Sequence, residues 1–78
     1  MTELELTLVQ AEGIILQEKA SSVNLPGLQG KIEILPDHEP MIIELTKGPI
    51  IFNERSFYLE EKGIALVTSS SCKIIIYP

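Results

Sequence analysis

The sequence predicts an all-β protein, and three observations support this. Glycine and proline recur at short intervals along the 78 residues, so few segments between them are long enough for an ordinary helix. Between these breaks, apolar residues alternate with polar ones or are β-branched, as in strands with one buried face. No stretch has the composition or apolar spacing of a long helix. Short strands at close spacing with turn signals indicate a sandwich or a barrel.

The first half of the chain contains five candidate strands. Leu4, Leu6 and Leu8 alternate with Glu5 and Thr7, which predicts a strand with one wet face. The second strand begins at residues 14–16, after Gly13. The remaining three are predicted at residues 23–25, 32–34 and 41–45, each bounded by a glycine or proline.

The second half contains four more candidates, at residues 50–52, 57–59, 64–68 and 73–77. The sequence Lys-Gly-Pro at 47–49 turns the chain before the first of them. Residues 53–56, Asn-Glu-Arg-Ser, are predicted to form a hairpin tip, and the serines at 69–71 to form the last turn. The pattern does not determine which strands pair.

Length and charge limit the function classes. A chain of 78 residues allows one domain, spanning residues 1–78. The net charge is -5, with 11 acids against 6 scattered bases, so nucleic acid and anionic lipid are poor partners. An acidic surface suits solubility or a basic protein partner. The N-terminal residues contain no basic region followed by a long apolar run, which argues against a signal or transit peptide.

Few residues are candidates for chemistry. Cys72 is the only cysteine, so we expect no intramolecular disulfide and a small apolar filler in the last strand. His38 is the only histidine, and its neighbours Asp37 and Glu39 would point to the opposite face of an extended chain. We therefore expect no metal site, no catalytic residue, no cofactor and no small-molecule substrate. The glycines at 27 and 30 lack the spacing of a phosphate-binding loop.

The segment from residue 25 to residue 50 has the most constrained backbone. Pro26-Gly27 and Gly30 require a tight turn. Pro36 and Pro40 fix two φ angles around His38 and so predict a rigid corner. A rigid corner loses little entropy on docking, so it makes a good contact surface. The residues themselves leave two readings open, a contact surface or a simple turn.

This segment carries a resemblance to a known family. Residues 25–40, Leu-Pro-Gly-Leu-Gln-Gly-Lys-Ile-Glu-Ile-Leu-Pro-Asp-His-Glu-Pro, resemble the core signature of the epsilon subunit of F-type ATP synthases. Ala11-Glu12, the turn at residues 45–48 and Gly63 are also similar to positions of that family, so the resemblance covers nearly the whole chain. It implies the N-terminal domain, a flattened β-sandwich of about ten short, mostly antiparallel strands.

The resemblance also implies a role. Such a domain is a non-catalytic rotor subunit of the central stalk, which docks on the gamma subunit and the membrane c-ring and couples proton or sodium flow to ATP synthesis. By the resemblance, the gamma side would include Ala11, Glu12, His38 and Ile43. The c-ring side would include Gln29, Gly30 and Lys31. The protein would lie peripherally on the cytoplasmic face of the bacterial inner membrane, reaching the membrane only through the c-ring.

Three positions depart from the family pattern. The sequence ends at Pro78, where the family continues into a C-terminal helical hairpin. Lys31 stands where many members have Glu, and Lys62 replaces the first glycine of a usual pair. An alternative reading is therefore a free-standing epsilon-like β-sandwich that binds proteins and no longer belongs to an ATPase. An enzyme has little support.

Overall fold

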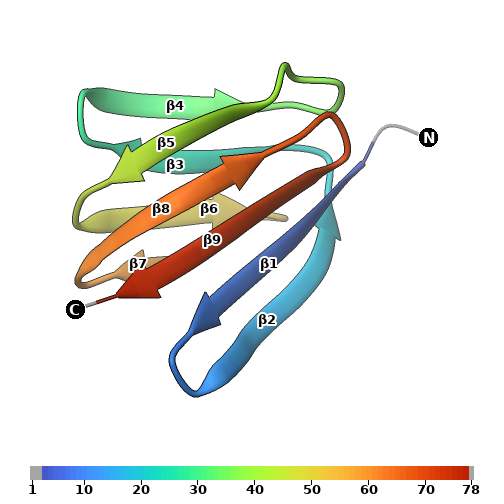
Figure 1. Ribbon diagram of the computed structural model, residues 1–78. Coiled ribbons are helices and arrows are strands. Elements are labelled where there is room, and N and C mark those ends of the chain that lie inside the picture. Colours follow the sequence, from blue (N-terminus) through green and yellow to red (C-terminus); the bar gives the residue numbers. More distant parts are fainter. Residues whose placement is uncertain (1–2, 78) are drawn as a thin grey trace.

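The computed structural model of the protein describes residues 3–77, which form nine strands and, within that range, no helix (Figure 1). The all-β class is confirmed, with nine strands where the resemblance implied about ten. The strands are β1 (Leu4–Gln10), β2 (Gly13–Ala20), β3 (Val23–Gly27), β4 (Gly30–Ile34), β5 (Met41–Leu45), β6 (Gly48–Phe52), β7 (Arg55–Leu59), β8 (Lys62–Val67) and β9 (Ser71–Tyr77).

The strands form two layers joined at a corner. Pairing follows the order β2-β1-β9-β8-β5-β3-β6-β7, with β4 beside β3. Every pair is antiparallel except β1 with β9, which is parallel. The ladder between β5 and β3 consists of one pair, Leu45 with Gly27, so the sheet folds over there. We call β2, β1, β9, β8 and β5 the front sheet, and β4, β3, β6 and β7 the rear sheet (Figure 1).

The core lies between the two sheets. Successive side chains of a strand point to opposite faces, so alternate residues are buried. In β1, Leu4, Leu6 and Leu8 are fully buried, as the alternation predicted. Cys72 is also fully buried, and the prediction that it fills the core is confirmed. One apolar cluster joins both sheets, with members from β1 to β9 that include Leu25, Ile34, Leu45, Ile50, Phe52, Leu59, Ala65, Val67 and Ile74.

The hairpin tip between β6 and β7 is shorter than predicted. It consists of Asn53 and Glu54, and β7 already begins at Arg55. Both turn residues have positive φ, 49° and 62°, as in a type I′ turn, whose twist matches that of the flanking strands. The sequence Asn-Glu lacks the glycine that usually marks this turn, which explains why the pattern suggested a longer loop.

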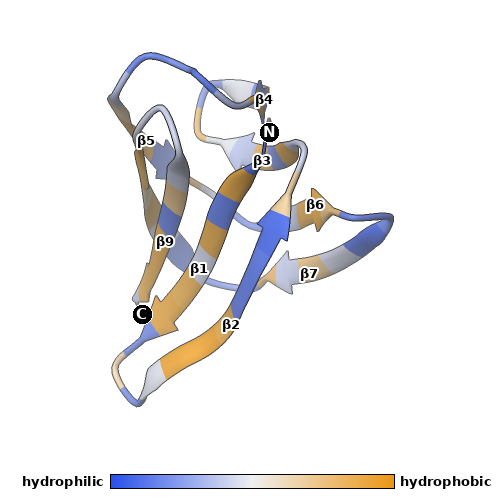
Figure 2. Ribbon diagram, turned by 90° about the vertical axis from the view of Figure 1, so that its right-hand side faces the viewer, coloured by the Kyte–Doolittle hydropathy of each residue, from blue (hydrophilic) through white to orange (hydrophobic). Residues whose placement is uncertain are grey.

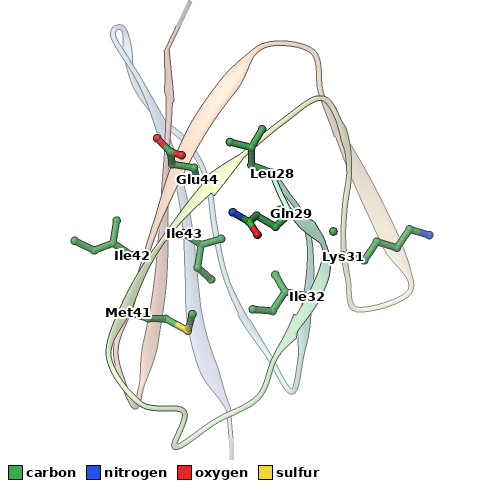
Figure 3. Close-up of a pocket in the computed structure, with 10 residues that line it drawn as sticks. Leu28, Gln29, Lys31, Ile32, Met41, Ile42, Ile43 and Glu44 are labelled. Carbon is green, nitrogen blue, oxygen red and sulfur yellow. The ribbon is translucent and has the colours of Figure 1, made fainter.

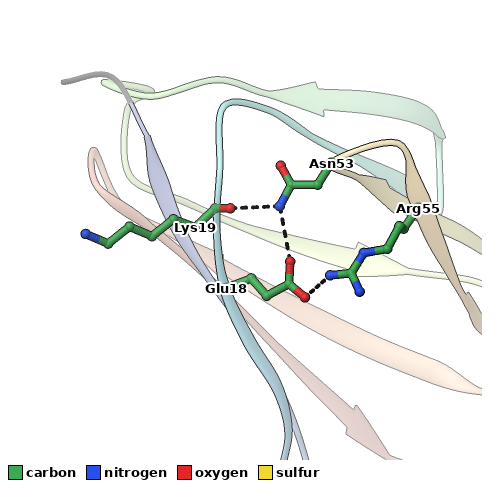
Figure 4. Close-up of polar contacts among 4 residues, drawn as sticks. All are labelled: Glu18, Lys19, Asn53 and Arg55. Carbon is green, nitrogen blue, oxygen red and sulfur yellow. Dashed lines mark hydrogen bonds and ion pairs between the residues drawn. The ribbon is translucent and has the colours of Figure 1, made fainter.

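This tip closes one side of the sandwich (Figure 4). The Asn53 side-chain amide donates hydrogen bonds to the Lys19 carbonyl oxygen at 2.8 Å and to the Glu18 carboxylate at 3.1 Å. Arg55 forms an ion pair with the same carboxylate. These contacts tie edge strand β2 of the front sheet to the rear sheet. On the opposite side, no side-chain hydrogen bond or ion pair joins β5 to β4 among the described residues.

Candidate partner-binding surfaces

The four residues expected on the gamma side lie in three separate places. Ala11 and Glu12 form the turn between β1 and β2, both exposed. His38 lies in the loop between β4 and β5, at the opposite end of the sandwich (Figure 1). The Ile43 side chain points inward from β5 and is 9% exposed. The structure does not bring these four residues together into one patch.

The corner around His38 is held by hydrogen bonds. Asp37 has a φ of 68°, and its N–H donates to the Ser69 carbonyl oxygen at 2.7 Å, which ties the loop to the turn between β8 and β9. The Nδ1 atom of His38 lies 2.8 Å from the Glu39 carbonyl oxygen. In residues 3–77, His38 belongs to no group of three or more potential metal ligands. The loop is therefore anchored through Asp37 to the β8–β9 turn.

The residues expected on the c-ring side form a single turn. Gln29, Gly30 and Lys31 lie at the β3–β4 hairpin, all exposed, and Gly30 has a φ of 131° that favours glycine. This hairpin lies at the upper left of Figure 1, near the end of β5, whereas the β1–β2 turn with Ala11 and Glu12 lies at the bottom. Across residues 3–77, no helix has the length and apolar character needed to span a bilayer.

An apolar row crosses the outer face of the front sheet, and the sequence analysis missed it. The strand register places Ile64 beside Ile75, Ile75 beside Val9, and Val9 beside Ile14. We call these four residues the apolar row. Ile14 is 62% exposed and Ile75 is 38% exposed. Figure 2 shows the first half of β2 coloured as hydrophobic beside β1.

A signal for this row exists in the sequence. The segments Ile14-Ile15-Leu16 and Ile74-Ile75-Ile76 contain consecutive apolar residues, so both faces of these strands carry apolar side chains. Only the register across four strands shows that the outward ones form a continuous row. Acidic residues lie at both ends of it: Glu44 pairs with Ile64, and Glu12 lies in the turn next to Ile14. The row therefore suits a partner with apolar and basic groups.

A groove opens where the two sheets separate (Figure 3). Its volume is about 610 Å³, and it lies between the β3–β4 hairpin and β5. Figure 3 shows Ile32 of β4 and Met41 and Ile43 of β5 pointing toward the space between the strands, and Ile42 pointing away. The groove thus adjoins both the expected c-ring turn and Ile43.

The Cys72 thiol is buried and is not accessible to a partner. Burial raises the pKa of the Cys72 thiol to about 11, because the thiolate would lose its hydration. The thiol is therefore protonated near neutral pH and lies inside the core.

The fold and these surfaces define a class: a small, two-layered β-sandwich domain with an exposed apolar row on one face. Residues 3–77 match the family described as "ATP synthase, Delta/Epsilon chain, beta-sandwich domain". The chain belongs to this family, and the resemblance found in residues 25–40 is confirmed. The family is that of a non-catalytic stalk subunit, in agreement with the expectation that the chain is not an enzyme.

Curated relatives are ATP synthase epsilon chains. The one from Moorella thermoacetica is 38% identical over 55 residues, covering 70% of this chain and 41% of the relative. The one from Rickettsia typhi is 27% identical over 78 residues, covering 92% of this chain and 71% of the relative. The one from Desulfitobacterium hafniense is 47% identical over 45 residues, or 34% of its length. The match thus spans between about a third and about 70% of these relatives.

Solved structures share the fold. A chain of the Tetrahymena thermophila mitochondrial ATP synthase, in a structure of its central stalk and c-ring, superposes with a TM-score of 0.77 at 15% identity. A chain of the Euglena gracilis mitochondrial enzyme superposes with a TM-score of 0.82 at 21% identity. The alignments cover 96% and 95% of this chain, and 63% and 50% of those chains. This protein therefore has the same fold as those two chains.

Proposed function

We propose that this protein is a non-catalytic rotor subunit of an F-type ATP synthase, which docks on gamma and the c-ring and couples proton or sodium flow to ATP synthesis. The family match over residues 3–77 carries this proposal. The protein would lie peripherally on the cytoplasmic face of a bacterial inner membrane, with no contact to lipid of its own. The whole of residues 1–78 would serve as one docking domain.

The apolar row is the proposed gamma-docking surface. An exposed apolar face across four strands is costly in water unless a partner covers it. Ala11 and Glu12 border the row at the β1–β2 turn, in accord with the family resemblance. His38 would contact gamma only if gamma also reached the other end of the sandwich, and Ile43 would support the surface from the core. The turn of Gln29, Gly30 and Lys31 is the proposed c-ring contact.

Two matched variants test this docking. Ile75 of the front sheet is 38% exposed, and Ile51 on the outer face of the rear sheet is 40% exposed, so Ile75→Asp and Ile51→Asp introduce the same charge at equal exposure on opposite faces. We expect Ile75→Asp to weaken binding to purified gamma, measured by titration calorimetry, by at least about tenfold, since a central apolar contact contributes about 2 kcal/mol. Ile51→Asp should bind like the parent chain.

The results of these binding measurements distinguish the rotor subunit from a free-standing binding domain. Equal affinities of the two variants would show that the apolar row is not the docking surface. If the parent chain itself failed to bind gamma, the protein would instead be a free-standing binding domain outside the ATPase. A third variant, His38→Glu, tests the corner: unchanged affinity would place that corner outside the gamma interface.

A further inference from the structure

The sandwich has four edge strands, and three of them carry features that prevent pairing with another chain. Such features include bulges, charges and cover by other elements. Edge strand β2 has a bulge in its ladder between Leu8 and Val9 and is covered at Glu18 by the β6–β7 tip. Edge strand β7 begins with Arg55, and edge strand β4 carries Lys31 and Glu33. Each of these three edges is therefore protected.

Edge strand β5 has the least protection of the four. Its sequence is Met-Ile-Ile-Glu-Leu, so Glu44 near its end is its one charged residue, and its ladder with β8 is regular over all five residues. On its other side, only Leu45 pairs, with Gly27 of β3. Ile42, in the middle of the strand, is 72% exposed. The part of this edge before Glu44 is apolar and open, and such an edge is expected to be covered in the working protein.

The backbone of β5 offers hydrogen-bonding groups to the open side. The Leu28 N–H donates to the Glu44 carbonyl oxygen at 2.9 Å, which shows that the peptide groups of Glu44 face away from β8. In an antiparallel ladder this direction alternates from residue to residue. The N–H and C=O of Ile42 therefore also face the open side, where none of the residues 3–77 forms a strand beside it. An extended segment would pair with these groups.

The groove would accommodate side chains of a segment paired with β5. A segment paired with β5 would continue the front sheet over the groove, and its inward side chains would contact Ile32, Met41 and Ile43. Its other side chains would lie next to Ile42 on the outer face, where Ile42 pairs in register with Leu66, one row away from the apolar row. The open edge and the apolar row thus belong to one continuous surface.

We propose that the partner protein that covers the apolar row contributes an extended, alternately apolar and polar segment that pairs with β5 at Ile42 and fills the groove. This inference rests on the proposed docking function and specifies how the partner is held. Main-chain hydrogen bonds give such strand addition its affinity, and the pockets for alternate side chains give it specificity. The Leu28–Glu44 hydrogen bond limits the added strand to the stretch of β5 before Glu44.

Amide hydrogen exchange on the intact chain, free and bound to purified gamma, tests this pairing. The Ile42 amide should exchange rapidly in the free chain, and the Ile43 amide slowly, because Ile43 is hydrogen-bonded to β8. Binding of gamma should slow exchange at Ile42 by at least about tenfold and leave Ile43 unchanged. The matched variants Ile42→Pro and Ile42→Ala add an independent measure. Proline removes the outward N–H, a change that edge strands tolerate, whereas alanine keeps it.

We expect Ile42→Pro to bind gamma at least about tenfold more weakly than Ile42→Ala. A complex in which the Ile42 amide stays unprotected would overturn the inference and leave the docking function intact. Protection of Ile42 already in the free chain, together with a dimeric mass in light scattering, would overturn it in favour of a second copy on this edge. Absence of any complex with gamma would overturn both proposals.

Discussion

Among the glycines with positive φ, we expect Gly48 to be the one where an added methyl group destabilises the fold most. It begins β6, just after the chain leaves the edge of the front sheet for the rear sheet, and its φ is 151°. A Cβ atom there would lie 2.7 Å from the Pro26 Cβ atom and 3.4 Å from its Cγ atom. Gly48→Ala therefore combines an unfavourable backbone conformation, costing roughly 1–3 kcal/mol, with overpacking against a rigid ring, roughly 1–3 kcal/mol more.

Gly13→Ala is the matched control. Gly13 has a φ of 130°, and a Cβ atom there would have no heavy atom within 4 Å, so only the backbone cost applies. The difference between the two variants isolates the contact with Pro26, about 1–3 kcal/mol. For a domain of this size, that difference corresponds to a melting temperature roughly 4–24 °C lower for Gly48→Ala than for Gly13→Ala.

Thermal unfolding followed by circular dichroism, with urea unfolding as a second measure, gives these values. Equal melting temperatures for the two variants would refute the reasoning, because they would mean that Pro26 moves away at no cost. The crossing between the sheets would then not be fixed by this contact.

Two further predictions concern the β6–β7 tip and the core thiol. Asn53→Gly should lower the free energy of unfolding by about 1 kcal/mol, because glycine keeps the positive φ but loses the bonds to Lys19 and Glu18; an unchanged urea midpoint would show that these bonds add nothing. Burial raises the pKa of the Cys72 thiol in the folded state to about 11. The stabilisation of the fold by the protonated thiol should therefore be complete below the unfolded pKa near 9. The free energy of unfolding should fall by roughly 2–3 kcal/mol as the pH rises to 11. Cys72→Ala should lack this part of the pH dependence, and identical slopes for the two proteins would contradict it.

The alternation in the sequence was sufficient to predict most of the fold. Leu4, Leu6 and Leu8 are buried as their spacing predicted, because a half-buried strand requires a period of two. The errors lie at turns. The Asn53-Glu54 turn is two residues long, and its Asn53 side chain forms hydrogen bonds to β2 that the local sequence does not predict. The conformation at Gly48 likewise depends on its close contact with Pro26 of β3, which lies far from it in the sequence.

The candidate site was less predictable than the fold. The turn of Gln29, Gly30 and Lys31 is exposed at one hairpin, as its own sequence implied. The gamma-side residues were taken together, yet Ile43 points into the core and His38 lies at the far end from Ala11. Side-chain direction in a strand depends on which face meets the other sheet, and a run such as Met-Ile-Ile does not indicate which residue turns inward.

The sequence by itself determined the all-β class, the positions of the strands along the chain and the family, because alternation, turn residues and the proline-bracketed signature are local properties of the chain. Only the tertiary structure decided that Ile14, Val9, Ile75 and Ile64 form one row and that β5 is left with an open edge. The row requires a parallel pairing between β1 and β9, which are separated by most of the chain. The open edge requires a sheet that folds over at Gly27 and Leu45. Such long-range pairings depend on how both sheets bury their apolar faces together, and no local pattern contains that information.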